Sequence, residues 1–509
     1  MSEPIIARGL RRQAGLRVAL FHQHCDRLSG ALLCSMAVFS PWAFGGTPPW
    51  AILTMNLAGG ALGLLLALKL FVRWFWRYRP PRWDDPADGS SPGPRAIRWL
   101  TLILAVLTLA ILAFCAVSAL NARSSYDVIR GTFTYHDHIC WLPHSYDGPR
   151  TWRYTINYLA LALAFWAARD WLLCKATSDS RQLRADSPDH VPGLVMPRRL
   201  RLLLWVLSIN GALLAAEALA QRLSGTEKLL WLLRPRLNAT ADAQLGPFNY
   251  RSNGSQYLNL VWPLSLGLWW RLRRTARELR PRRSWWRRHR YHVLLPCVLL
   301  MSATPVLSLS RGGAIVSVAS MLGAIVIFWV GWRHHSLLMR LGVVCFFGGA
   351  LWLGLHFSGE KLAARMKQWD EGFQQREAMF QTAREIARDY RWFGIGPGTL
   401  DPVFQLYRQS PDEYWPAQLH NDWLETRVTF GWLGSALIGL AFVAVLARYF
   451  LPGGVPTGWR LVLLIWLALG GCLLHARWDF PLQVHSILFL FLLHCAVLTT
   501  LSRRTLALG

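Results

Sequence analysis

Uninterrupted apolar stretches of about 17 to 25 residues recur along the whole chain, and polar residues are concentrated between them. Two examples run from Trp50 to Val72 and from Leu100 to Leu120. A helix of that length crosses a hydrocarbon core of roughly 30 Å and satisfies its own backbone hydrogen bonds. A soluble fold would have to bury every stretch against the others, although a single core stops growing at about 250 to 300 residues. The pattern therefore predicts membrane-spanning helices.

Basic residues gather in every second segment between the apolar stretches, most densely in residues 8–17, 73–82, 175–201 and 271–290. Because cytoplasmic loops carry an excess of lysine and arginine, this alternation predicts that both termini lie in the cytoplasm. We expect an all-α polytopic membrane protein of about twelve transmembrane helices, with one large, mainly helical periplasmic loop. The predicted spans are residues 30–46, 50–72, 99–120, 154–174, 201–221, 255–271, 292–309, 313–332, 338–357, 429–449, 459–475 and 485–501.

Three of the segments that face away from the cytoplasm are too long to be turns, and the third is by far the longest. It divides the chain into a transmembrane bundle of about nine spans at residues 1–357, a periplasmic loop at residues 358–429, and a bundle of about three spans at residues 430–509. Long loops on a rigid scaffold commonly carry function, so we expect the catalytic residues in the loop.

Composition adds little to this interpretation. The chain has 55 lysine and arginine residues against 28 aspartate and glutamate residues, a formal net charge of +27. In a soluble protein this excess would suggest nucleic-acid binding, but its place in alternate loops favours contact with membrane lipids and no nucleic acid. The nine cysteines form no CxxC pair, so neither a disulfide framework nor a zinc site is expected. The basic N-terminal region predicts no cleavable signal peptide.

The long loop begins with apolar residues at helical spacing. The residues of this stripe are Leu362, Met366, Trp369, Phe373, Phe380, Ala383 and Ala387. Arg376 lies inside the stripe and not on the opposite face, so its guanidinium points towards the protein and needs an anionic partner. That partner is either a substrate or a neighbouring carboxylate, such as Asp370 or Glu377.

Three further motifs contain residues suited to chemistry. Ser310-Arg311-Gly312-Gly313 lies between two apolar stretches near the outer face, the run from Phe393 to Gly398 contains three glycines, and Leu419-His420-Asn421 precedes the next span. Each has a structural alternative: Arg311 as an interfacial residue with its charged end in water, the glycines as a tight turn, and His420 as a loop cap.

Taken in order, these motifs resemble the O-antigen ligase and O-antigen polymerase superfamily. Its members combine about a dozen spans, an arginine at a span end, an arginine helix in a large periplasmic loop, a G-x-G-x-G turn and an H-N-x-x-L sequence. The resemblance covers roughly residues 240–490, including weaker similarities at Phe248–Asn253 and at His475–Gln483.

The resemblance implies roles for individual residues. Arg311 and Arg376 match two arginines thought to bind a lipid diphosphate, and His420 matches the proposed catalytic base. Arg251 is a weaker candidate for substrate binding because the asparagine spacing beside it is shifted by one, and Asn421 is a candidate through the H-N motif. Thr429 departs from the glutamate that the family often has at this position, although the nearby Glu425 is a possible equivalent.

The implied function is that of an inverting, metal-independent glycosyltransferase of the bacterial inner membrane. It transfers a glycan from undecaprenyl diphosphate to a hydroxyl of lipid A–core on the periplasmic face. No cofactor is expected. Polymerisation of lipid-linked repeats, with a glycan as the acceptor, and transfer to a protein remain open, because all three activities share the donor.

A lipid-linked glycan transporter is the alternative from a different class. Transporters usually carry ionisable groups at mid-membrane. Glu217 is the one clear carboxylate that we place inside a predicted span, whereas the candidate reactive residues lie at the outer interface. The pattern therefore favours an enzyme.

The basic segment near residues 271–290 provides a first test. Replacing several arginines between Arg273 and Arg288 with glutamine should disturb topology or lipid contact, since these charges are predicted to anchor a cytoplasmic loop. Reporter fusions would measure topology, and glycan transfer would measure turnover. A selective loss of turnover with unchanged topology would contradict the interpretation.

Overall fold

The computed structural model describes most of the chain, with several gaps. The described residues are 5–83, 95–176, 196–278, 289–330, 337–367, 369–408, 417–450 and 459–506. Of the predicted features, residues 279–288 of the basic segment and the side chains of Trp369, Asp370 and Phe373 lie outside the description.

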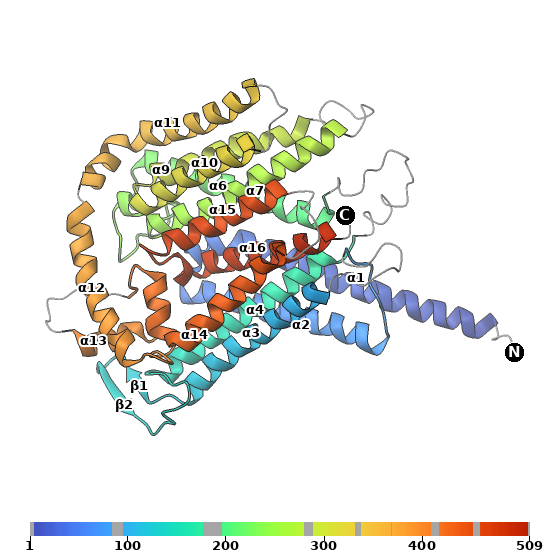
Figure 1. The fold of residues 1–509 in the computed structure, drawn as a ribbon, viewed down its shortest axis with the longest axis horizontal. Coiled ribbons are helices and arrows are strands. Elements are labelled where there is room, and N and C mark those ends of the chain that lie inside the picture. Colours follow the sequence, from blue (N-terminus) through green and yellow to red (C-terminus); the bar gives the residue numbers. More distant parts are fainter. Residues whose placement is uncertain are drawn as a thin grey trace.

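Fourteen α-helices and one small β-hairpin make up the described fold (Figure 1). The helices are α1 (Ile5–Trp42), α2 (Pro49–Phe75), α3 (Arg95–Leu120), α4 (Gly148–Leu173), α6 (Arg198–Ser224), α7 (Arg251–Glu278), α9 (Leu294–Leu307), α10 (Arg311–Val330), α11 (Leu337–Lys367), α12 (Trp369–Asp389), α13 (Leu400–Tyr407), α14 (Asp422–Leu446), α15 (Trp459–His475) and α16 (His485–Leu506). The strands β1 (Ser124–Asp127) and β2 (Thr132–Tyr135) pair antiparallel.

Each of the twelve predicted spans overlaps one of these helices. Seven helical segments of the described chain are long and apolar enough to cross a membrane, and α15 and α16 contain shorter apolar segments. The mainly helical class is therefore confirmed, and the number of twelve crossings stays a prediction. The hairpin is a departure from the all-α expectation. Aromatic side chains such as Tyr126 and Phe133 favour strands, and Gly131, at φ 66°, makes the turn between them.

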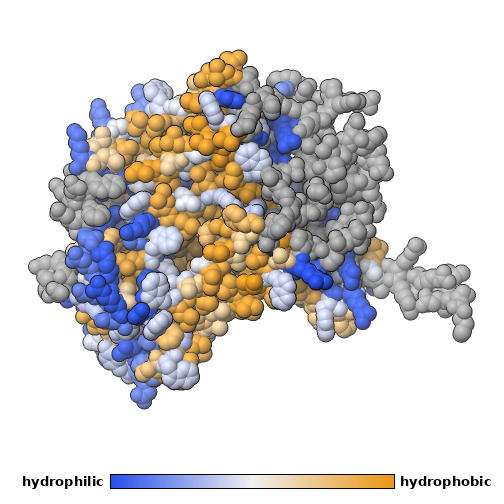
Figure 2. Space-filling view, viewed as in Figure 1, coloured by the Kyte–Doolittle hydropathy of each residue, from blue (hydrophilic) through white to orange (hydrophobic). Residues whose placement is uncertain are grey.

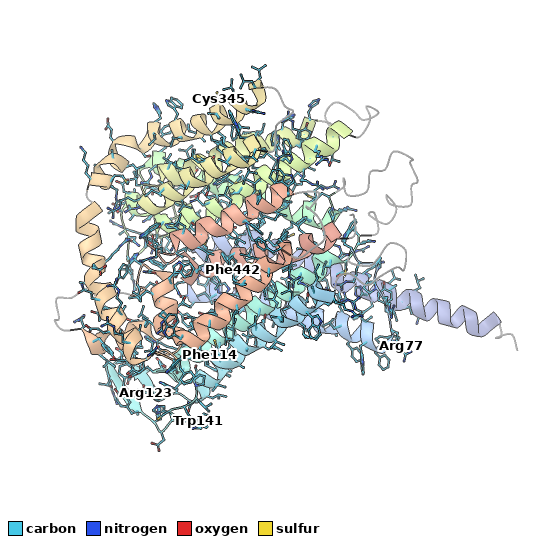
Figure 3. The ribbon with its side chains drawn as sticks, in the orientation of Figure 1. Arg77, Phe114, Arg123, Trp141, Cys345 and Phe442 are labelled. Atoms are coloured by element: carbon cyan, nitrogen blue, oxygen red, sulfur yellow. The ribbon has the colours of Figure 1, made fainter. Side chains whose placement is uncertain are left out.

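The two ends of the helix bundle differ. Figure 1 shows both chain termini at one end, and α12, α13 and the hairpin at the other. Figure 3 shows Arg77 at the first of these ends and Arg123 and Trp141 at the second. Figure 2 shows an apolar band across the middle of the visible face, next to hydrophilic residues at the end that carries α12. This is the distribution expected of a bundle that crosses a lipid bilayer.

Helix α7 lies at the centre of the bundle, in contact with α6, α9, α10, α15 and α16. Its middle is fully buried, with Trp262 and Val261 both inaccessible to solvent. The first turn of α7 carries Arg251 and Ser252, so the most enclosed helix places its first residues at the bundle end that holds α12.

Buried ion pairs join four helices towards the end of the bundle that carries the termini. Lys69 of α2, which is inaccessible to solvent, lies 3.1 Å from Asp26 and 3.0 Å from Asp170. Arg73 and Arg199 contribute further pairs, at 2.6 Å to Asp170 and 2.8 Å to Asp26. The expectation that Glu217 is the one carboxylate inside a span was therefore wrong. Asp170 lies within α4, where cations from neighbouring helices offset the cost of burying its charge.

The predicted apolar stripe of the long loop belongs to two helices. Helix α11 extends to Lys367, and α12 begins at Trp369. Leu362 packs in a cluster with α10, whereas Phe380 and Ala383 join a separate cluster with α13 and the glycine-rich turn. The residues of the stripe therefore pack against two different surfaces.

The glycine-rich turn and α14 meet where two glycines face each other. Gly431 interrupts α14 with φ 61° and ψ −166°, a conformation open essentially to glycine alone. A Cβ on Gly431 would lie 2.3 Å from the carbonyl oxygen of Trp392 and 2.6 Å from the nitrogen of Gly394. Two hydrogen bonds of 3.0 Å, from Ile395 and Gly396 to carbonyls of α14, close the contact. The turn is thereby held against the kink of α14.

Replacing Gly431 with alanine should destabilise the fold by about 2 kcal/mol or more, because it adds a steric clash to a strained backbone. Gly439→Ala in the same helix is the matched control, since an added Cβ there meets nothing within 4 Å. Thermal unfolding in detergent would compare them. Equal stability of the two variants would contradict the proposed role of the kink.

Candidate active site

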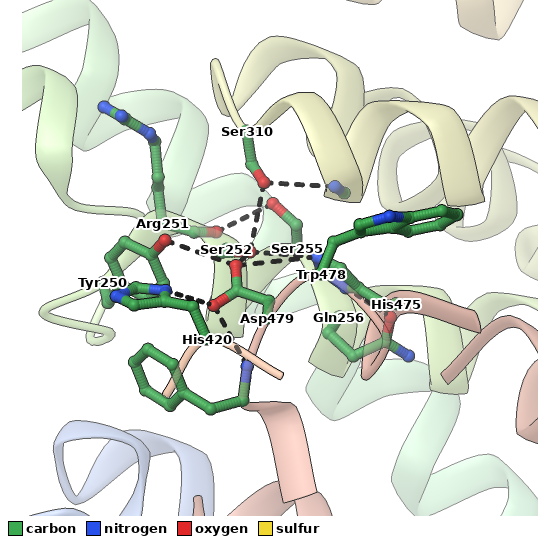
Figure 4. A network of polar contacts seen from close by, with 12 residues as sticks. Tyr250, Arg251, Ser252, Ser255, Gln256, Ser310, His420, His475, Trp478 and Asp479 are labelled. Atoms are coloured by element: carbon green, nitrogen blue, oxygen red, sulfur yellow. Dashed lines mark hydrogen bonds and ion pairs between the residues drawn. The ribbon is translucent and has the colours of Figure 1, made fainter. Parts of the chain in front are cut away.

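A buried carboxylate organises the polar residues at this end of the bundle. Asp479 lies in the turn between α15 and α16 and is 5% exposed. Figure 4 shows its side chain at the centre of the network. Its donors are the Nδ1 of His420 at 3.1 Å, the backbone nitrogen of Phe480 at 3.0 Å, the hydroxyl of Tyr250 at 3.2 Å and the hydroxyl of Ser252. Four donors for one carboxylate favour its ionised form.

The pKa of Asp479 is lowered by this environment. Burial alone would raise the pKa, but the hydrogen bond and charge of His420, the charge of His475 and the hydroxyl of Ser252 together outweigh it. Asp479 therefore stays ionised down to a pH below about 3.9, the usual pKa of an aspartate. At neutral pH it is a fixed negative charge beside His420.

His420 is held in a left-handed backbone conformation, at φ 50°. The residues on either side fasten its loop. The nitrogen of Leu419 donates to the carboxylate of Glu425 at 2.9 Å, and the side-chain oxygen of Asn421 accepts from the nitrogen of Leu424 at 3.1 Å. Asn421 is 4% exposed and caps α14, so its predicted contact with substrate has a structural competitor.

Asp422 fastens the same loop to the turn that carries Asp479. Its backbone nitrogen lies 2.8 Å from the carbonyl oxygen of Ala476, and its carboxylate accepts from the nitrogen of Leu482 at 2.8 Å. The loop before α14 and the turn after α15 therefore form one rigid unit.

The two ring nitrogens of His420 have different surroundings. Its ring lies edge-on against Tyr250 and Phe480, with ring centroids 5.9 and 4.8 Å away. Nδ1 faces Asp479, and within the described part of the chain Nε2 has no hydrogen-bond partner. A carboxylate that accepts from Nδ1–H leaves the lone pair on Nε2, and the side chain is 19% exposed. The nitrogen that could accept a proton is thus the open one.

Hydroxyl groups connect Asp479 to the start of α10. Ser310 donates to the hydroxyl of Ser252 at 3.2 Å and accepts from the nitrogen of Gly313 at 3.1 Å. His475 lies beside them, with Nε2 3.0 Å from the hydroxyl of Ser252. An added Cβ on Gly312 would approach this Nε2 to 2.7 Å, so a glycine allows α10 to begin next to the histidine. This contact positions Arg311 near the His420–Asp479 pair.

Arg376 reaches the same turn from α12. Its Nη1 donates to the carbonyl oxygen of Trp478 at 2.9 Å, one residue before Asp479. The alternative partner Glu377 pairs instead with Arg384, at 2.7 Å. The guanidinium thus lies at the edge of the pair and not in a salt bridge along its own helix.

Arg311 joins Arg376 on the side of α11. Its Nη1 donates to the carbonyl oxygen of Arg365 at 3.3 Å, and its charge interacts with those of Arg376 and Arg365. Three residues predicted from separate motifs, Arg311, Arg376 and His420, therefore converge around one turn.

Arg251 also lies close enough to Arg365 for their charges to interact. Its guanidinium donates to the carbonyl oxygen of Asp242 and is directed away from Asp479 (Figure 4). The carboxylate of Asp242 pairs with Arg222 at 2.7 Å and with Lys361 at 3.2 Å. Like charges of Arg222 and Arg365 surround Arg251. We call the arginines Arg222, Arg251, Arg311, Arg365 and Arg376 the cationic group.

Sequence reasoning missed the residues that orient His420. Asp479 and His475 belong to the late motif His475–Gln483, and Ser252 follows Arg251, so both segments had been noticed without a role. Asp479, the single carboxylate of the late motif, was the available signal. Arg222 and Arg365 carried no motif at all.

A family model described as O-antigen ligase matches residues 296–439. This match supports the resemblance to the O-antigen ligase and polymerase superfamily. The match includes Arg311, Arg376 and His420 but ends before Asp479, so the O-antigen ligase region takes the partner of its histidine from a later part of the chain. No curated protein sequence matches the chain.

Asp479→Asn should lower kcat for glycan transfer by about 10²- to 10⁴-fold with little change in KM for the donor, since the amide removes the charge that orients His420. Glu377→Gln, on the exposed side of α12, is the control and should retain activity. An unchanged kcat in Asp479→Asn would remove Asp479 from the mechanism.

Proposed function

We propose that this chain is an inverting, metal-independent glycosyltransferase of the O-antigen ligase type. It transfers a glycan from undecaprenyl diphosphate to a hydroxyl of lipid A–core, on the periplasmic face of the bacterial inner membrane. The observation that carries the proposal is the meeting of the His420–Asp479 pair with the cationic group at one end of an apolar helix bundle.

The cationic group suits the donor. A diphosphate carries several negative charges, and the planar guanidinium binds phosphate oxygens through two parallel hydrogen bonds. Asp242 compensates part of the positive charge through Arg222 and Lys361, while Arg311 and Arg376 donate hydrogen bonds to the backbone carbonyl oxygens of Arg365 and Trp478. An anionic ligand would relieve the repulsion among these arginines. This favours a diphosphate near Arg311 and Arg376.

The reaction needs two acts from the protein. Nε2 of His420 takes the proton of the acceptor hydroxyl, whose oxygen forms a bond to the anomeric carbon. The bond from that carbon to the diphosphate oxygen breaks, and its electron pair stays on the diphosphate. Arg311 and Arg376 stabilise this growing charge, at roughly 3 to 4 kcal/mol for each well-placed donor. Attack opposite the leaving group inverts the anomeric configuration.

Polymerisation is the second candidate within the same superfamily. The donor chemistry at Arg311, Arg376 and His420 serves either acceptor, so the two activities differ only in the molecule that supplies the hydroxyl. Complementation of ligase-null and polymerase-null strains, read on lipopolysaccharide gels, separates them.

Arg311→Ala, Arg376→Ala and His420→Ala should each reduce transfer by at least about 10²-fold while leaving membrane insertion intact. The assay is transfer from purified lipid-linked oligosaccharide in detergent, without a membrane gradient, which a transporter could not perform. Arg384→Ala is the matched control, because Arg384 lies two turns along α12 from Arg376 and pairs with Glu377. Full activity in any of the three variants would remove that residue from the mechanism. Gradient-dependent movement of the donor without transfer would refute the proposal that the chain is an enzyme.

A further inference from the structure

A cavity of about 330 Å³ opens at the same end of the bundle as α12 and α13, and its lining does not include the His420–Asp479 pair. It lies between the hairpin, the first turns of α4 and the glycine-rich turn. The residues that line it include Tyr126, Asp147, Arg150, Arg153, Tyr154 and Gly398. None of these residues contributes to the proposed reaction.

The walls of this cavity are rigid. Gly398 has φ 80°, and an added Cβ there would lie 2.3 Å from the ring of Tyr154, so the turn lies directly on the tyrosine. Thr151 of α4 donates to the carbonyl oxygen of Pro397 at 3.0 Å. The guanidinium of Arg150 lies 5.5 Å from the ring centre of Tyr126, which restrains the ring. The cavity is therefore formed before any ligand arrives.

The polar groups of the cavity supply both acceptors and donors. Asp147 caps α4 and lies 3.3 Å from the Nε of Arg150, while the Nη1 of Arg150 lies 2.8 Å from Asp401. Arg153, one turn along α4 from Pro149, is exposed and has no hydrogen bond or ion pair within the described residues. Arg150 therefore pairs with carboxylates of the protein, whereas the guanidinium of Arg153 can bind a ligand.

These features match the chemistry of a sugar ring. A pyranose has apolar C–H faces, which suit the tyrosine rings, and a rim of hydroxyls that both donate and accept hydrogen bonds. The volume lies at the small end of the range of about 300 to 1,000 Å³ for ligand sites, which suits one residue of a glycan. Arg153 adds a preference for a carboxylate on that sugar.

The cavity is also connected to the His420 loop. Tyr154 interacts electrostatically with Glu425, and the same carboxylate accepts the hydrogen bond from Leu419, immediately before His420. A glycan that reacts at His420 has further sugar units beyond the reacting one. A site lined by Tyr154, which interacts with Glu425, is placed to hold one of them.

We propose that this cavity binds one saccharide unit of the glycan, with a preference for an acidic sugar, at a distance from the reacting bond. This inference rests on the proposed function for its ligand, but the site can be tested without transfer. Binding at the cavity orients the glycan and contributes to KM, not to the chemical step.

Glucuronic acid and glucose are a matched pair of probes, because they differ only in the carboxylate. We expect saturation-transfer NMR on the full chain in detergent to detect glucuronic acid more strongly than glucose. Tyr126→Ala should weaken binding of both sugars at least fivefold, and Arg153→Ala should abolish the preference. Arg130→Ala is the control for Arg153, since Arg130 lies on the hairpin outside the lining of the cavity. Binding should persist in His420→Ala, which separates this site from catalysis.

Transfer assays complete the test. Tyr126→Ala and Arg153→Ala should raise KM for a lipid-linked glycan that contains uronic acid at least fivefold, with kcat within twofold of the unchanged chain. Sugar binding without any transfer would refute the proposed function and retain the site. Absence of sugar binding, or equal binding in Tyr126→Ala and the unchanged chain, would contradict the proposal that this cavity binds a saccharide. Neither result would affect the transferase proposal.

Discussion

The buried charge of Asp479 ties together three parts of the chain that are far apart in sequence. A carboxylate removed from water costs several kcal/mol unless it is fully hydrogen-bonded. Asp479 meets that requirement only when the start of α7, the loop before α14 and the turn after α15 are all in place, because each supplies at least one of its donors. The same requirement that completes the packing also presents His420 with its Nε2 open.

Charged side chains are arranged differently at the two ends of the bundle. Near the termini, Asp26 and Asp170 lie within 3.1 Å of cations on neighbouring helices, and these pairs hold α1, α2, α4 and α6 together. At the other end, the arginines of the cationic group interact with one another's like charges, and Asp242 pairs with Arg222. The diphosphate of the proposed donor would offset this repulsion.

Backbone geometry connects the two candidate sites. The kink at Gly431 allows the glycine-rich turn to pack against α14, and this turn forms one wall of the proposed saccharide cavity. The first turn of α14 carries Glu425, which restrains the loop of His420. Helix α14 therefore supports both a wall of that cavity and the loop that carries His420.

Hydrophobic periodicity, charge alternation and motif order were enough to predict the mainly helical bundle and the resemblance to the O-antigen ligase and polymerase superfamily. These properties are local, since a run of apolar residues reports burial in lipid whatever the helix packs against. The pairing of His420 with Asp479 joins residues 59 positions apart and depends on how α14 and α15 are rotated and tilted against each other. The cap at Asn421, the direction of Arg251 and the kink at Gly431 likewise follow from the tertiary structure. Only the tertiary structure decided them, because the sequence pattern of one helix specifies which face is buried and not which residue it meets there.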